Sequence, residues 1–121
     1  MSSVLIIGFT AEATDLTGLD ISVETLRERI AAGDAEVVAA GYEVARGWVG
    51  IDHAAGVAEV RELLTAHTFD VVLIGNGVRG FPRFTELFEQ LVNAVHELAP
   101  RARFAFNIDP PSTLEAIQRN S

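Results

Sequence analysis

Residues 70–80 read Asp-Val-Val-Leu-Ile-Gly-Asn-Gly-Val-Arg-Gly, and this stretch decides the fold class. The apolar run from Phe69 to Ile74 is typical of a strand buried on both faces, as in a parallel sheet. Glycines end this strand at 75–80, and Pro82 suits the first turn of a helix because its missing N–H would be unpaired there anyway. The stretch therefore predicts a strand, a glycine-rich loop and a helix, the repeating unit of an α/β fold.

The same alternation continues on both sides of this stretch. Further strands are predicted at 4–9, 42–49 and 102–106, and helices at 22–41, around 57–64, at 82–98 and at 112–120. The order βαβαβαβα predicts a single α/β domain over residues 1–121, with a four-stranded parallel sheet between two helix layers. We expect the strand order 2-1-3-4 of a doubly wound, Rossmann- or flavodoxin-like fold.

Short-range signals mark the ends of the predicted helices. Ser22 is a good N-cap for the first helix and Gly41 a good C-terminal cap. Gly33, in the middle of that helix, weakens it by about 1 kcal/mol relative to alanine. Ser112 and Glu115 have the spacing of a capping box, which predicts the start of the last helix.

The composition restricts the classes of partner. The chain has 17 acidic and 9 basic residues, a net charge of −8 and no lysine, so neither nucleic acid nor an anionic membrane is an expected partner. It has no cysteine, which excludes disulfides, zinc–thiolate sites and thiol catalysis. No histidine pair has metal-ligand spacing, so no metal site is predicted. The sequence lacks the basic region of a signal peptide and any apolar run of roughly 18 residues, so we expect a cytoplasmic protein.

A ligand site is expected at one edge of the sheet. Doubly wound sheets bind ligands beyond the carboxyl ends of their strands, in the crevice where the strand order reverses, here between the first and third strands. The loop at 10–21 is longer than usual for a βα unit and is a candidate binding loop or lid. The predicted ligand-binding residues follow three of the strands: Thr10, Gly75, Asn76, Gly77, Arg79, Asn107 and Asp109.

Arg79 is the candidate side chain for binding an anion. An arginine in a glycine-rich loop can hold a carboxylate or phosphate through two parallel hydrogen bonds. The alternative is a surface ion pair with Glu86 or with a carboxylate of the 10–21 loop. The sequence does not decide between these two roles.

The glycines at 75, 77 and 80 form a G-x-G-x-x-G pattern between a strand and a helix, as in a dinucleotide fingerprint. However, the pattern follows the third strand rather than the first, and Asp109 lies too far along the chain to match the acidic residue of the fingerprint. We therefore do not expect a nicotinamide or flavin dinucleotide. The alternative is that the glycines only permit positive φ. The sequence contains neither a P-loop motif nor a G-x-S-x-G nucleophile elbow.

Three polar candidates have structural interpretations that the sequence favours. Asn107 and Asp109 precede two prolines, where such residues commonly form turns through their own side chains. His53 is a candidate acid or base near neutral pH. The pair Asp52-His53 reads better, however, as the cap and first turn of a helix.

The remaining ring-bearing side chains are expected to have structural roles. His96, the second candidate acid or base, lies on the border of an apolar helical stripe and is predicted to be packed. Trp48 and Tyr42 fall in the second strand and are predicted to pack as well. His67, near the end of a helix, is expected to interact favourably with the helix dipole.

The second half of the chain resembles a group of small bacterial proteins of unassigned function. The similarity lies in Asp70-Val-Val-Leu-Ile-Gly-Asn-Gly-Val-Arg79, Leu87-Phe-Glu-Gln-Leu-Val-Asn-Ala-Val-His96, Ala99-Pro100 and Phe106-Asn107. The resemblance implies a Rossmann-like α/β fold, and it transfers no activity. It adds weight to a functional role for His96 and draws attention to these polar residues: Arg79, Glu89, Asn93, His96 and Asn107.

These observations favour the binding, with or without turnover, of a small anionic metabolite at the carboxyl edge of the sheet. They leave the identity of the ligand and any cofactor open. The alternative is a non-catalytic module that forms a homodimer or binds another protein. Hydrophobic residues make up 49% of the chain, slightly more than a small monomer needs, and this surplus favours the alternative.

Overall fold

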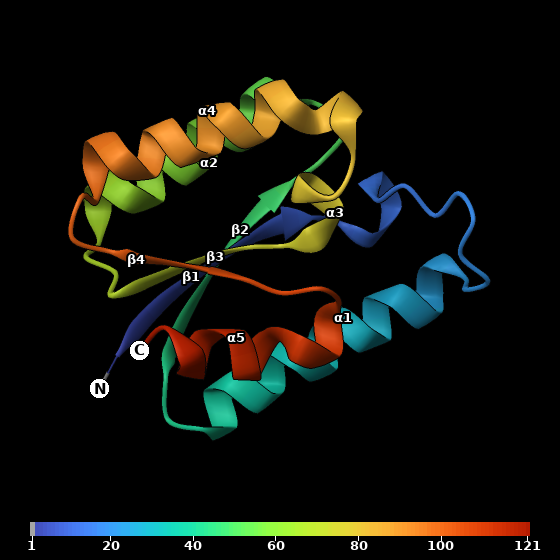
Figure 1. Ribbon diagram of the computed structural model, residues 1–121, viewed down its shortest axis with the longest axis horizontal. Helices are drawn as coiled ribbons and strands as arrows, with labels where there is room; N and C mark the ends of the chain where they lie inside the picture. Colours follow the sequence, from blue (N-terminus) through green and yellow to red (C-terminus); the bar gives the residue numbers. More distant parts are fainter. Residues whose placement is uncertain (1) are drawn as a thin grey trace.

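A computed structural model describes residues 2–121 and shows a parallel sheet between two layers of helices (Figure 1). The strands are β1 (Ser3–Phe9), β2 (Glu43–Val49), β3 (Val71–Ile74) and β4 (Arg103–Phe106), in the order β2-β1-β3-β4. The predicted doubly wound α/β fold and its strand order are confirmed. Each strand begins within two residues of its predicted start.

The helices cover both faces of the sheet, as Figure 1 shows. One layer consists of α2 (His53–Ala66) and α4 (Thr85–Leu98), and the other of α1 (Val23–Ala39) and α5 (Thr113–Arg119). Shorter helical turns are α3 (Asn76–Arg79) and the 3-10 turns η1 (Ala11–Ala13), η2 (Pro82–Phe84) and η3 (Pro110–Ser112). No helix within residues 2–121 is both long enough and apolar enough to cross a membrane.

Each face of the sheet has its own apolar core, because successive side chains of a strand point to opposite faces. In β1, Leu5 and Ile7 pack in the core under α2 and α4. Val4 and Ile6 pack in the core under α1 and α5. All four side chains are at least 98% buried. The central strand is therefore apolar on both faces, which explains its continuous apolar sequence.

The predicted caps of α1 and α2 are confirmed. Ser22 accepts a hydrogen bond from the Thr25 amide at the start of α1. Gly41 follows the helix with φ +98°, a conformation that favours glycine. Asp52 accepts a hydrogen bond from the Ala55 amide and begins α2, as the structural interpretation of Asp52-His53 predicts.

The predicted capping box at Ser112 and Glu115 is wrong. The capping box lies one turn earlier, where Asp109 accepts from the Ser112 amide at 3.0 Å and Ser112 Oγ accepts from the Asp109 amide at 3.3 Å. The reason is that Pro110 and Pro111 occupy the first turn of η3, where the absence of an N–H costs little. The 3-10 turn η3 therefore precedes the last helix, while α5 itself begins after Ser112, as predicted.

Gly33 lies where α1 crosses η3. A Cβ at this position would lie 2.7 Å from the Pro110 carbonyl oxygen, which is too close for a methyl group. The low helix propensity of Gly33 is therefore offset by a close contact that only glycine permits. This contact fixes the distance between α1 and the segment that follows β4.

Candidate functional site

A cavity of about 350 Å³ opens at the carboxyl ends of β1, β3 and β4, on the face covered by α1. It lies beside the point where the strand order reverses between β1 and β3. Its lining comes from β1, β2, β3, the 10–21 loop, α1, the segment 75–81 and residues 107–113. Its volume falls within the roughly 300–1,000 Å³ typical of small-molecule sites.

The structure brings together five of the nine predicted ligand-binding and acid–base residues. Gly75, Asn76, Gly77, Asn107 and Asp109 line the cavity. Thr10, Arg79, His53 and His96 do not. The cavity thus contains the backbone of the glycine-rich segment, while the candidate anion-binding arginine and both candidate acid–base histidines lie outside its lining.

Asn107 ties two parts of the cavity wall together. Its side chain is buried; Oδ1 accepts from the Asn76 amide at 2.9 Å and Nδ2 donates to Thr113 Oγ1 at 3.0 Å. Thr113 in turn donates to the Pro110 carbonyl at 2.7 Å. The side chain therefore holds α3 against the start of α5, a structural role of the kind that the sequence favours for Asn107.

Arg79 does not form the predicted alternative ion pair with Glu86. Its Nη2 donates to the Asn107 carbonyl at 2.9 Å and lies 3.3 Å from Asn76 Oδ1, and its guanidinium lies 5.4 Å from the centre of the Phe106 ring. The carboxylates of the 10–21 loop pair with two other arginines: Glu12 with Arg27, and Asp15 with Arg83, whose Nη2 lies 2.7 Å from Asp15 Oδ2. Arg79 is the last residue of α3, and this turn directs its side chain toward the end of β4.

The glycine-rich segment is helical rather than a left-handed turn. Gly75 has φ −67° and Gly80 has φ −81°. In the part of the chain that the structure describes, only Gly18 and Gly41 have positive φ. The interpretation that the segment's glycines permit positive φ is therefore wrong. At Gly80 the constraint is space, because a Cβ there would lie 2.9 Å from the Asn76 carbonyl oxygen.

The wall of the cavity contains an ion pair that sequence reasoning missed. Arg46 of β2 and Asp34 of α1 both line the cavity, with Nε 3.2 Å from Asp34 Oδ2. Their side chains are only 17% and 24% exposed. The contact does not have hydrogen-bond geometry, so Nε–H has no acceptor within residues 2–121. Arg46 is thus a largely buried cation with an unused donor.

Three neighbours hold the Arg46 guanidinium in place. It lies 4.1 Å from the centre of the Trp48 ring, and Nη1 is 3.4 Å from the Ile6 carbonyl oxygen. A Cβ at Gly8 would lie 3.2 Å from Nη1, so the guanidinium rests against the β1 backbone. These contacts place the guanidinium at the cavity wall.

Burial changes the acid–base properties of this pair. Burial raises the pKa of the Asp34 carboxyl above its usual 3.8, and the positive charge of Arg46 only partly opposes the rise. Burial likewise lowers the pKa of Arg46, against the opposing effect of Asp34. Because folded Asp34 binds its proton more tightly, its contribution to folding is fully present below pH 3.8. That contribution is lost as pH rises through the folded pKa.

We expect Arg46→Met to raise the pKa of Asp34 further. Methionine keeps much of the side-chain volume but removes the charge that stabilises the carboxylate, while burial remains. An NMR titration of the Asp34 side-chain carbon measures this pKa directly. Arg46→Lys, which retains the charge, is the control and should raise the pKa less. A lower Asp34 pKa in Arg46→Met would contradict the assigned contact.

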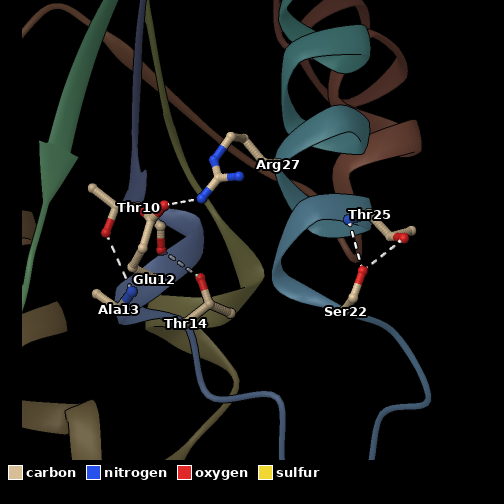
Figure 2. A network of polar contacts seen from close by, with 7 residues as sticks. All are labelled: Thr10, Glu12, Ala13, Thr14, Ser22, Thr25 and Arg27. Atoms are coloured by element: carbon tan, nitrogen blue, oxygen red, sulfur yellow. Dashed lines mark hydrogen bonds and ion pairs between the residues drawn. The ribbon is translucent and has the colours of Figure 1, made fainter.

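The loop at 10–21 forms one rim of the cavity and is fastened at both ends (Figure 2). At its start, Thr10 accepts from the Ala13 amide, and Glu12 pairs with Arg27 of α1. This pairing lowers the pKa of the Glu12 carboxyl, chiefly through the hydrogen bond with Arg27. At its end, Ser22 caps α1. Leu19 lies between these anchors and is 56% exposed although it lines the cavity.

The two candidate acid–base histidines lie away from the cavity. His53 begins α2 and is half-buried beside the rings of Phe9 and Phe84, with centroids 5.6 and 5.7 Å away. His96 is exposed in the last turn of α4, so the prediction that it is packed is wrong. It follows Val95, the last buried residue of the helix, and α4 returns the chain toward the amino ends of the strands.

The packing predictions for the aromatic residues of the second strand hold only in part. Tyr42 precedes β2, packs against the core under α1 and α5, and its hydroxyl lies 3.0 Å from Ser121 Oγ. Trp48 is 37% exposed, because β2 is an edge strand and Arg46 covers only part of its ring. Trp48 is also the only tryptophan of the chain, so its fluorescence reports on Arg46.

Neither a metal-binding cluster nor a match to a known family indicates what this cavity binds. Residues 2–121 contain no group of three or more histidine, cysteine, aspartate or glutamate side chains placed to hold a metal ion. Comparison with protein-family models finds no family that matches the chain, and comparison with curated proteins finds no match. The function must therefore be argued from the residues of the cavity itself.

Proposed function

We propose that the protein binds a small anionic metabolite in the cavity at the carboxyl edge of its sheet, with the anion facing Arg46. The observation that carries the proposal is the Arg46 guanidinium, a largely buried cation that lines the cavity and lies 3.2 Å from Asp34. An anionic oxygen on the cavity side of this guanidinium would form a charge-assisted hydrogen bond with it. Arg29 also lines the cavity and adds positive charge at its wall.

The proposal is one of binding rather than of turnover. The two candidate acid–base histidines, His53 and His96, lie outside the lining. The lining residues within 2–121 include neither serine nor histidine, so they offer no serine–histidine pair. The residues present can hold an anion, and they favour the role of a ligand-binding domain.

Trp48 provides the test of this proposal. Hexanoate, succinate and inorganic phosphate serve as probes, and fluorescence is followed as each is added. We expect a saturable change for at least one probe, because an anion that engages Arg46 changes the contact between its guanidinium and the Trp48 ring. In Arg46→Met, which also removes the contact that gives this signal, binding is measured by calorimetry and should weaken about tenfold, the typical loss of a charged hydrogen bond. If none of the three probes binds saturably, the proposal is contradicted.

The alternative function is an interaction module, and one observation favours it. Trp48 is 37% and Ile51 86% exposed, and the two are three residues apart in the sequence at the end of edge strand β2. Exposed apolar residues grouped in this way are typical of protein contacts. Light scattering measures the mass in solution, and a monomer at micromolar concentration would argue against a homodimer.

A further inference from the structure

We propose that the ligand is an amphipathic monocarboxylate, with its carboxylate on Arg46 and its apolar part at the mouth of the cavity. This inference rests on the proposed function and narrows it to one chemical class. Three features of the cavity support it: the apolar walls, the larger number of carboxylates than arginines in the lining, and the contact between Arg46 and Asp34 at the wall.

The walls between Arg46 and the mouth are mainly apolar. Leu26 and Ile30 of α1 line the cavity, and so does Phe81, which precedes η2. At the mouth, Leu19 and Ile108 line the cavity from two different loops and are 56% and 73% exposed. Apolar side chains left in water around a cavity are stabilised when an apolar ligand covers them. An apolar ligand body therefore fits between the mouth and Arg46.

The charges of the lining favour a ligand with one negative charge rather than two. Four carboxylates line the cavity, at Asp15, Asp20, Asp34 and Asp109, against two arginines. Asp15 is neutralised by Arg83, which lies outside the lining. A dianionic phosphate would meet repulsion from the remaining carboxylates, whereas a single planar carboxylate matches the two-pronged geometry of a guanidinium.

Asp34 competes with such a ligand for Arg46. Its Oδ2 lies 3.2 Å from Arg46 Nε, so a bound carboxylate would share the guanidinium with a second negative group. Removing the Asp34 charge should therefore tighten binding, while removing the Arg46 charge should weaken it. A purely structural ion pair would give losses in both variants, so the opposite signs identify a ligand-binding role.

Calorimetry with hexanoate, hexanamide and inorganic phosphate tests the inference. We expect hexanoate to bind about tenfold more tightly than either of the others, because only hexanoate combines one charge with an apolar chain. Asp34→Asn should strengthen hexanoate binding several-fold, and Arg46→Met should weaken it about tenfold and remove the preference over hexanamide. Leu19→Ser changes an exposed position and leaves the core intact. It should weaken the binding of hexanoate but not the binding of acetate.

The outcomes separate this inference from the function on which it rests. If hexanamide or phosphate binds as tightly as hexanoate, the inference that the ligand is a monocarboxylate is overturned, while the proposal that the cavity binds a ligand stands. Weaker hexanoate binding in folded Asp34→Asn would also overturn it, since Asp34 would then support the ligand rather than compete. If none of the three probes binds, both the inference and the proposed function are overturned. If Asp34→Asn does not fold, the Leu19→Ser variant provides the test. Equal losses of affinity for hexanoate and for acetate in Leu19→Ser would overturn the inference.

Discussion

Replacing Asn107 with alanine is expected to lower the free energy of unfolding by about 2–4 kcal/mol, because each partner that loses a buried hydrogen bond costs about 1–3 kcal/mol. The Asn76 amide would lose its acceptor and Thr113 Oγ1 its donor. For a domain of this size the midpoint of thermal unfolding should fall by roughly 10 °C. Circular dichroism during heating, together with urea unfolding, measures both quantities.

Two further variants show whether the hydrogen bonds are responsible. Asn107→Asp keeps an acceptor for the Asn76 amide and replaces only the donor to Thr113, so it should be less harmful than Asn107→Ala. Asn93→Ala, at an exposed position of α4, should change the stability by less than about 0.5 kcal/mol. If Asn107→Ala were as mild as Asn93→Ala, the network between α3 and α5 would not stabilise the fold.

Gly33→Ala is expected to destabilise the protein by about 1–3 kcal/mol, the usual cost of forcing an extra group into a packed contact. Alanine is the better helix former by about 1 kcal/mol, so helix propensity alone predicts the opposite sign. The contact decides the outcome, because the new methyl group would lie 2.7 Å from the Pro110 carbonyl oxygen. Urea unfolding of the variant measures the sign and the size of the change.

The exposed face of the same helix provides the control for Gly33. Ala35→Gly removes a methyl group that contacts no core residue and should cost about 1 kcal/mol through helix propensity alone. Gly33→Ala should also weaken hexanoate binding, because Pro110 and Thr113 line the cavity and would be pushed away from α1. A gain in stability for Gly33→Ala would show that α1 and η3 do not approach this closely.

The topology could be predicted because it follows from strong, local patterns. Val71 to Ile74 and Val4 to Ile7 are continuous apolar runs, as buried parallel strands require, and the intervening segments have helical periodicity. The rule that ligands bind where the strand order reverses then points to the edge between β1 and β3. A cavity lies at that edge.

The chemistry of the cavity wall could not be predicted in the same way. Arg46 and Asp34 lie on β2 and α1, and each looks like an ordinary surface charge when only its neighbours in sequence are considered. Their contact depends on how closely α1 packs over the edge strand, which no local pattern encodes. One signal was present: Arg46 stands in the middle of a predicted strand, between Val44 and Trp48 on the same face. A charge in that position is a candidate for a buried pair.

Arg79 illustrates the opposite difficulty. Its place after a glycine-rich loop made it the strongest candidate for an anion, but the loop folds into the short helix α3. The side chain then donates to the Asn107 carbonyl and lies outside the cavity lining. The direction of a side chain from a short helical turn depends on the exact turn geometry, and loop sequence does not specify that geometry.

The most direct test of the central claim is an NMR titration of the protein with hexanoate. The account predicts saturable shifts for the Arg46 Nε–H and for the amides of Gly8, Gly75 and Gly77, all of which line the cavity. The His96 amide, outside the lining, should not shift. Unchanged resonances for Arg46 and the three glycines, at hexanoate concentrations that saturate the Trp48 signal, would contradict binding in this cavity.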